Sequence, residues 1–528
     1  MAAGPHHTDM EFLMAEHGEG TWVTVFEHIG DLRSGRQGAL YCALADKDVS
    51  ARAMADYGWD VQIGTDAPGF VTSYSGGEET STYYPRSADP FQRLVYQRTF
   101  HGRKDGYIEL CEEFRLLHNL YFDAKANQYI TFDEAGDEVV VVKLSADRVE
   151  VRRSYLRSFM AATQRDLLLY FEFTHHFNDP VDPIESVASD TLRAEVYSGG
   201  AYVAGYKYFV RIVGKKRLLA APLHECGIAP FEKAKRFEAF LIGGDDDAPI
   251  LHTSDPATLR DYFGGNPDAP HYLTPVFFRM EVMKKYYGSS DYEIEDGRLS
   301  RKGAWSLRLD NNAPGHVSVF LGDLGRELPS KEQLYWKSFN IVPDGRTMSH
   351  ANFARSFLGQ FHESENPAHL FKQKFTRLNK RWAERAGWEL FLPLADKDRH
   401  FFDDIRSLLT NEQAEFDALI LCLAKTTIDS LNVKGIRKSV EGGETDKSIA
   451  LLGQLLARLN VPDAEAYVTL LHGVQTVRST GVAHRKGTDY EKAVARYGID
   501  ANDYAEAFNA ILLQFVRLFD ALLDDLGE

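Results

Sequence analysis

The apolar residues of this 528-residue chain change their spacing near Ser349, and this change constrains the fold more than any other feature. Before it, short β-branched and aromatic runs, such as residues 21–26, 129–132 and 167–173, are separated by glycine, aspartate, asparagine and proline. After it, prolines become scarce and apolar residues recur at helical spacing. The sequence therefore predicts an α+β protein whose β-rich N-terminal part precedes an all-helical bundle.

Proline punctuation divides the chain further. Two prolines within residues 178–183 interrupt any regular element, so we expect a β-rich N-terminal domain at residues 1–180 and a second β-rich domain at 181–345. A helical connector at 346–400 then leads into the bundle, which takes residues 401–528. The predicted architecture is multidomain, with its helices gathered at the C-terminal end.

The last helix of the bundle is the clearest element. Its apolar residues from Tyr504 onward lie on one face. Asp503 and Glu506 stand three residues apart at its start, which is the spacing of a capping box. Similar apolar stripes at residues 416–431 and 449–459 predict two more helices.

A fourth helix carries the residue of most interest. It opens after Pro462-Asp463, runs from Ala464 to about Val477, and its apolar face ends on Arg478. A guanidinium keeps its charge in any protein environment, so a position at the end of an apolar stripe requires a partner. Arg478 therefore marks either a functional site or a structural ion pair.

Arg478 also begins a short motif that ends at His484 and is followed at once by Arg485 and Lys486. This motif and the helices around it resemble HEPN domains, small all-helical modules of bacterial toxins, abortive-infection systems and CRISPR effectors. Many of them are metal-independent RNases whose arginine and histidine stand a few residues apart. The resemblance covers roughly the last quarter of the chain. It implies that Arg478 and His484 form the catalytic pair, and that two copies build one composite site in a homodimer.

The chemistry of RNA cleavage suits these residue types. RNA carries its own nucleophile, the 2′-hydroxyl, so cleavage needs a proton acceptor, a proton donor and positive charge on the phosphoryl oxygens. Histidine supplies the proton transfers and arginine supplies the charge. Ser479, Arg485 and Lys486 are the predicted RNA-binding residues. Ser479 stands where many active HEPN members carry asparagine, aspartate or histidine.

Three interpretations of the motif stay open. In the first, the protein is a metal-independent endoribonuclease in anti-phage defence, and its N-terminal part senses a phage-derived or protein trigger or restrains the bundle. In the second, it is a non-catalytic HEPN protein that binds RNA, a nucleotide or a protein partner. In the third, Arg478 caps helix carbonyls and His484 holds a turn. We expect no metal ion and no cofactor.

Composition limits the classes of partner. The chain is 44% hydrophobic and 26% charged, which excludes wholesale disorder. Its formal net charge of -17 opposes long-range attraction to nucleic acid, so any RNA contact requires a local basic patch. The most basic stretch, residues 371–385, has one aromatic face. It fits either a helix that grips RNA or a solvated helix that packs through its aromatic residues.

Cysteine spacing and hydropathy favour the cytoplasm. The four cysteines lie far apart, as expected for buried thiols in a reducing compartment. The N-terminus lacks the pattern of a signal peptide, and no apolar segment approaches the ~18 residues of a membrane span. We therefore expect a cytoplasmic protein with no membrane contact.

Histidine patterns elsewhere do not predict a metal site. His175 and His176 are adjacent in an expected strand, so they point to opposite faces and cannot readily share an ion. His362-Glu363 is not followed by a second histidine at the spacing of the H-E-x-x-H motif. Arg355 and His362 repeat the arginine-to-histidine spacing approximately, but no basic turn follows this histidine.

Overall fold

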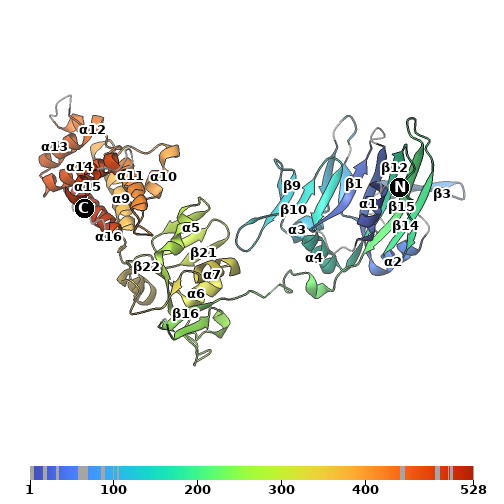
Figure 1. Ribbon diagram of the computed structural model, residues 1–528, viewed down its shortest axis with the longest axis horizontal. Coiled ribbons are helices and arrows are strands. Elements are labelled where there is room, and N and C mark those ends of the chain that lie inside the picture. Colours follow the sequence, from blue (N-terminus) through green and yellow to red (C-terminus); the bar gives the residue numbers. More distant parts are fainter. Residues whose placement is uncertain are drawn as a thin grey trace. The chain divides into compact units, whose positions relative to one another are not determined.

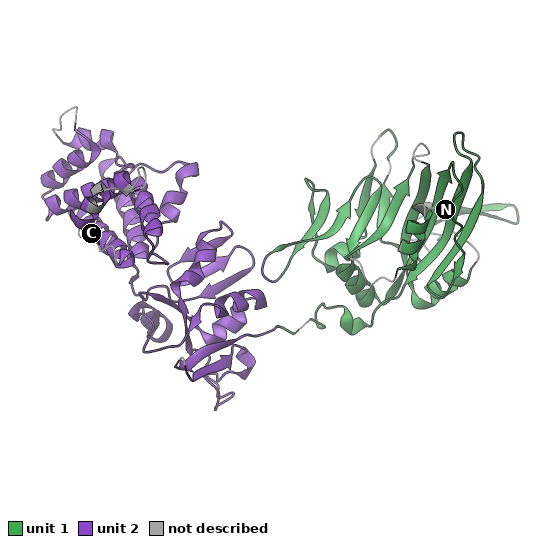
Figure 2. Ribbon diagram, in the orientation of Figure 1, with its two compact units in different colours: residues 1–133, 137–235 green, residues 134–136, 236–528 purple. Residues whose placement is uncertain are grey.

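The computed structural model gives the chain two compact units (Figure 2). Unit 1 comprises residues 1–133 and 137–235, and unit 2 comprises residues 134–136 and 236–528. Unit 1 is mainly β, whereas unit 2 is mixed, with its helices toward the C-terminal end (Figure 1). The residues that the structure describes are 5–15, 21–30, 35–56, 69–84, 90–98, 100–103, 106–232, 234–245, 247–440, 446–481, 488–496, 499 and 503–526.

Unit 1 is built on an antiparallel sheet with eleven strands among the described residues. These are β1 (Trp22–Ile29), β2 (Arg36–Asp46), β5 (Gln92–Arg93), β8 (Tyr121–Asp123), β9 (Gln128–Phe132), β10 (Glu138–Leu144), β11 (Arg148–Arg152), β12 (Arg165–Phe177), β13 (Val187–Ala188), β14 (Leu192–Gly200) and β15 (Tyr208–Leu218). Their order is β13-β14-β15-β12-β2-β1-β11-β10-β9-β8, and β5 pairs with β2.

Helices and hairpins complete unit 1. The helices are α1 (Pro5–Met14), α2 (Lys47–Ala55), α3 (Glu112–Leu117), α4 (Arg153–Thr163) and the 3-10 helix η2 (Leu223–Glu225). The hairpins pair β3 (Gly69–Ser75) with β4 (Glu78–Tyr84), and β6 (Val95–Arg98) with β7 (Tyr107–Leu110).

Strand β12 supplies core residues on both faces of the sheet. Leu167 and Leu169 are buried in one cluster with residues of α1 and α4. Leu168 instead packs with Met54 of α2. Successive side chains of a strand point to opposite faces, so the apolar run of β12 serves helices on both sides of the sheet.

The two histidines near the end of β12 follow the same alternation. Nε2 of His175 lies 2.5 Å from a carboxylate oxygen of Asp9 on α1. The ring of His176 lies beside those of Tyr206 and Phe209. The two imidazoles therefore have different partners.

The expected boundary at residue 180 falls inside unit 1. Strand β12 ends at Phe177, yet β14 and β15 continue the same sheet, and β15 pairs with β12 along its full length. The two prolines interrupt the chain without ending the unit, which extends to Lys235.

The β part of unit 2 consists of small antiparallel sheets and short helices. The strands are β16 (Ala239–Gly244), β17 (Pro249–Thr253), β18 (Pro275–Arg279), β19 (Tyr292–Glu295), β20 (Arg298–Arg301), β21 (Trp305–Arg308), β22 (His316–Phe320) and β23 (Asn340–Ile341). The helices are η3 (Pro256–Thr258), η4 (Met280–Met283), α5 (Lys284–Tyr287), α6 (Leu321–Glu327) and α7 (Ser330–Lys337). Their shared core centres on buried Tyr286, Phe278 and Trp336.

The remainder of unit 2 is helical, as the change in apolar spacing predicts. Its elements are α8 (His350–Phe353), the π-helix η5 (Ala354–Leu358), α9 (Pro367–Ala386), η6 (Asp396–Asp398), α10 (His400–Asp403), α11 (Gln413–Thr426), α12 (Val433–Ser439), α13 (Ser448–Arg458), α14 (Ala464–Gly481), α15 (Thr488–Arg496) and α16 (Tyr504–Asp525). The α+β class and the helical C-terminal part are thus confirmed.

Local details of the last helix match the sequence pattern. The carboxylate of Asp503 accepts a hydrogen bond from the Glu506 amide at 3.0 Å, which caps α16. The apolar face of α16 is buried against α9, α11 and α14. The capping residue thus marks where the helix begins, and the apolar stripe marks the face that it buries.

Helix α9 belongs to the same core, although we expected residues 346–400 to form a connector. Phe371, Leu378 and Trp382 are buried in one cluster with residues of α11 and α16. The basic stretch 371–385 therefore packs through its apolar and aromatic face. Arg377 and Lys380 of this stretch are exposed.

The four cysteines are buried and free, as expected. Burial in apolar surroundings raises the pKa of the Cys111 thiol to about 12 and that of Cys422 to about 11. A thiol reacts as its thiolate, so these two side chains act as small apolar residues.

Candidate functional site

Arg478 lies in the last turn of α14, directly after the buried Val477. Its Nη1 donates a hydrogen bond to Oδ1 of Asp429 at 2.7 Å. The same carboxylate lies 3.1 Å from Nζ of Lys425 on α11. The arginine at the end of the apolar stripe thus has the partner that the sequence argument requires.

The ion pair fixes the guanidinium without enclosing it. The side chain of Arg478 is 28% exposed and that of Asp429 is 31% exposed. A guanidinium has five N–H donors. Among the described residues, Asp429 is its hydrogen-bond partner. The Arg478 side chain therefore stays partly accessible.

The other residues of the motif divide into two groups. Ser479 is exposed, and its hydroxyl donates to the carbonyl of Thr476 at 2.9 Å, within the same helix. His484, Arg485 and Lys486 lie outside the described residues. The geometry between Arg478 and His484 is therefore a prediction of the sequence alone.

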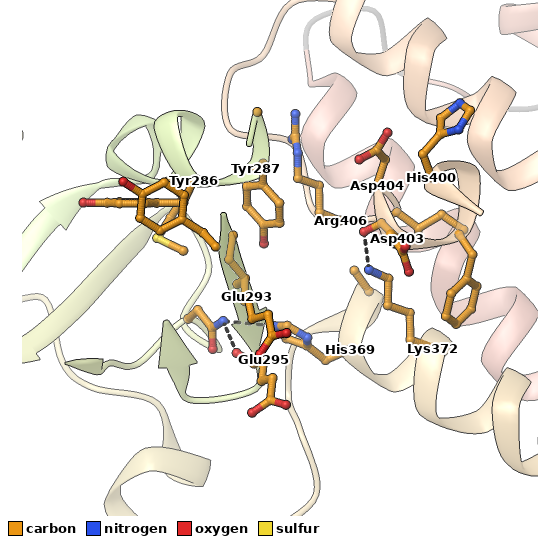
Figure 3. Close-up of a pocket in the computed structure, with 18 of the residues that line it drawn as sticks. Tyr286, Tyr287, Glu293, Glu295, His369, Lys372, His400, Asp403, Asp404 and Arg406 are labelled. Atoms are coloured by element: carbon orange, nitrogen blue, oxygen red, sulfur yellow. Dashed lines mark hydrogen bonds between the residues drawn. The ribbon is translucent and has the colours of Figure 1, made fainter. Parts of the chain in front are cut away.

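A cavity of about 1100 Å³ forms a second candidate site within unit 2. In Figure 3, Tyr287, Glu293 and Glu295 of the β part face side chains of α9 and of the segment around α10, whereas Tyr286 lies further back in the core. Its acidic and basic lining residues are Glu293, Glu295, Lys302, His369, Lys372, Asp396, Arg399, His400, Asp403, Asp404 and Arg406. The cavity is large enough to admit a small molecule, and its lining is more polar than that of most ligand pockets.

His369 is held in the first turn of α9 by Asn311. The Asn311 amide nitrogen lies 3.0 Å from Nε2 of His369 and 3.0 Å from the Glu295 carbonyl, and its oxygen accepts from the Gly297 amide. The amide therefore donates to Nε2, which leaves the ring proton on Nδ1. Burial lowers the pKa of His369 to about 4, so the ring is neutral at physiological pH.

Lys372 lies one turn further along α9. Its Nζ donates to the Asp403 carbonyl at 2.7 Å (Figure 3) and lies 5.7 Å from the centre of the Phe402 ring. Burial disfavours the ammonium form and lowers the pKa of Lys372 to about 8. The cavity thus combines a neutral histidine with a lysine that is partly neutral near physiological pH, the protonation states of a base or a nucleophile.

Sequence reasoning placed Lys372 on a flank of a basic helix and did not single out His369. The available signal was their spacing of three residues, which puts two ionisable groups on neighbouring positions of one helix face. That spacing is common on solvated helices. The pair is half-buried because the β part of unit 2 and residues 396–409 close around it, and both segments lie outside the local helix pattern.

The lowered pKa of Lys372 predicts unusual reactivity. Only the neutral amine is acylated, and an ordinary lysine has a pKa of about 10.4. At pH 8 about half of the Lys372 side chains are neutral, a fraction roughly 100-fold larger than for an ordinary lysine. We expect its labelling by limiting acetic anhydride, followed by peptide mass spectrometry, to rise with a midpoint near pH 8.

Lys380, an exposed lysine of the same helix, is the internal reference for this experiment. Its labelling should rise at higher pH than that of Lys372. Parallel labelling of both lysines across the pH series would show that burial does not shift the Lys372 pKa.

No family model, curated protein or solved structure matches this chain. Within the described ranges, none of the helices combines the length and the apolar character that crossing a lipid bilayer requires.

Proposed function

We propose that this protein is a metal-independent endoribonuclease whose helical part is a HEPN-like bundle. The placement of Arg478 carries the proposal: the guanidinium is oriented by Asp429 at the end of α14 and stays partly exposed. An arginine held in this way can bind a phosphoryl oxygen without reorganising first, which is the condition for electrostatic stabilisation of a transition state.

The residues have distinct roles in the proposed reaction. His484 accepts the proton of the 2′-hydroxyl as that oxygen attacks the phosphorus, and a second histidine donates a proton to the leaving 5′-oxygen. The products are a 2′,3′-cyclic phosphate and a free 5′-hydroxyl. A homodimer supplies the second histidine, while Ser479, Arg485 and Lys486 bind the RNA backbone.

The biological setting is part of the same proposal. The protein acts in the cytoplasm as an anti-phage effector, and its N-terminal part senses a phage-derived or protein trigger or restrains the bundle. The net charge of -17 favours a local RNA site over general nucleic-acid binding.

The cavity favours a second candidate function. A non-catalytic HEPN-like protein that binds a nucleotide would place a small polar ligand near His369 and Lys372. The aromatic rings of Tyr287 and Phe402 line the same cavity and offer faces on which a base could stack.

Total RNA incubated with the purified chain in EDTA tests the first function. We expect cleavage that leaves 2′,3′-cyclic phosphate ends, and light scattering should show a dimer or a larger oligomer. Uncut RNA with retained nucleotide binding would favour the second function. A strict monomer would remove the composite site.

A further inference from the structure

Three side chains of metal-ligand type meet in the segment that leads from the β part of unit 2 into α9. Nδ1 of His350 lies 3.1 Å from Nε2 of His362 and 3.8 Å from Oε1 of Glu365. All three ligand atoms lie within 4.8 Å of one another. Two ligands ~2.0–2.1 Å from a tetrahedral zinc ion lie about 3.3 Å apart. The two separations from His350 are close to this value, and the remaining pair, within 4.8 Å, draws closer when an ion binds.

The imidazole of His362 already presents a lone pair. Its Nδ1 lies 2.8 Å from the carbonyl oxygen of Glu363, which has no proton to give, so Nδ1 carries the ring proton. Nε2 is then unprotonated and accepts the Nδ1 proton of His350. A metal ion can replace the proton between the two rings. That proton then moves to Nε2 of His350, so that Nδ1 can bind the ion. A ligand histidine commonly donates its second nitrogen to a carbonyl in this way.

The backbone around His350 is anchored to the β part of unit 2. Ser349, the N-cap of α8, donates from both its amide and its hydroxyl to the buried carboxylate of Asp310, at 2.7 and 2.8 Å. The backbone of His350, the first residue of α8, is therefore held in place next to Ser349.

The other two residues are fixed as well. Arg355 donates twice to the His362 carbonyl, at 3.1 and 2.5 Å, and forms an ion pair with Asp296 at 2.7 Å. Glu365 accepts from the amide of Ala351 at 2.9 Å. Arg355 thus holds the loop that carries His362 in place. The three side chains are therefore near one another before any ion binds.

We propose that His350, His362 and Glu365 bind one zinc ion. Two neutral imidazoles and one carboxylate match the three-ligand set of open zinc sites, whereas magnesium and calcium require oxygen ligands. The side chain of His350 is 69% exposed and that of Glu365 is 36% exposed. The fourth coordination position therefore faces solvent and takes a water molecule. This site goes beyond the proposed RNA cleavage, which needs no metal.

Isothermal titration of the chelator-treated full chain with zinc chloride tests the proposal. We expect binding with one ion per chain at this site. Loss of an outer partner of a ligand already costs ~10–100-fold in affinity, so His350→Ala and His362→Ala should each weaken this binding by at least ~100-fold. Glu365→Gln keeps an acceptor for the Ala351 amide but removes the charge, and should weaken binding by ~10-fold or more.

His252→Ala is the matched control, because His252 lies on β17 in the same unit and outside this group. It should bind zinc as the unaltered chain does. Cobalt added in place of zinc should give visible absorption bands that disappear in His362→Ala. Circular dichroism of each variant shows that it has folded. Zinc binding that is absent, or that is unchanged in folded His350→Ala and His362→Ala, would overturn the proposal.

Discussion

Replacing Arg478 or His484 by alanine is expected to lower RNA cleavage by at least ~100-fold each. Proton transfer by a positioned side chain contributes ~100- to 10,000-fold. Loss of one preorganised donor to a developing negative charge costs ~100- to 1000-fold. Both residues act on one transition state, so the double variant should be little worse than the poorer single variant. Cleavage rates of end-labelled RNA in EDTA measure the effect.

The Arg478 variant should fold normally, which keeps the result interpretable. An exposed or half-exposed ion pair such as that of Arg478 with Asp429 contributes ~0–1 kcal/mol to stability. Arg458→Ala is the matched control, because Arg458 is an exposed arginine in the last turn of α13. Its cleavage rate should equal that of the unaltered protein. Undiminished cleavage by Arg478→Ala would remove Arg478 from the reaction.

Asp429→Asn tests whether the hydrogen bond to Arg478 or the negative charge beside it matters for cleavage. The amide of asparagine can still accept a hydrogen bond from Arg478, but it no longer attracts the guanidinium as an ion. We expect an intermediate loss of cleavage, because the guanidinium then samples more positions.

Phe371→Ala is expected to destabilise the helical part by ~3–5 kcal/mol. Phe371 of α9 is fully buried, and its ring centre lies 5.3 Å from that of Phe519 and 5.9 Å from that of Phe515, both on α16. Truncation leaves a cavity between two helices that the surrounding rings cannot fill. Urea unfolding followed by far-ultraviolet circular dichroism, to which these helices contribute strongly, measures the loss.

Phe361→Ala is the control for that truncation, because Phe361 is 91% exposed in the same unit. It should change the free energy of unfolding by less than ~0.5 kcal/mol. A cost below ~1 kcal/mol for Phe371→Ala would contradict the placement of α9 in the core of the bundle.

Much of the helical part could be predicted because its signals are local. The stripe of α16 and the Asp503 cap involve neighbours three or four residues apart, and helix geometry turns such spacing into a common face or a hydrogen bond. The same logic showed that Arg478 needs a partner. It could not name Asp429, because 49 residues separate the two and no local rule relates them.

The domain limits, the pair of ionisable residues in the cavity and the histidine cluster all depend on contacts outside the local sequence pattern. Strand β15 returns to β12 across two prolines, so residues on both sides of position 180 share a sheet. His369 and Lys372 become half-buried because the β part of unit 2 and residues 396–409 line a cavity around them. His350 and His362 have no motif spacing. They meet because Asp310 anchors Ser349 beside the first histidine, and Arg355 binds the carbonyl of the second.

The sequence by itself determined the α+β class, the helical C-terminal part, the cap of its last helix and the need of Arg478 for an opposite charge. Periodicity, capping and the permanent charge of arginine act over a few residues and do not depend on the rest of the fold. The tertiary structure alone decided which carboxylate meets Arg478, which ionisable groups lose water in the cavity, and which histidines stand close enough to share an ion. Those properties are set by burial and by contacts that no local helix or strand geometry relates.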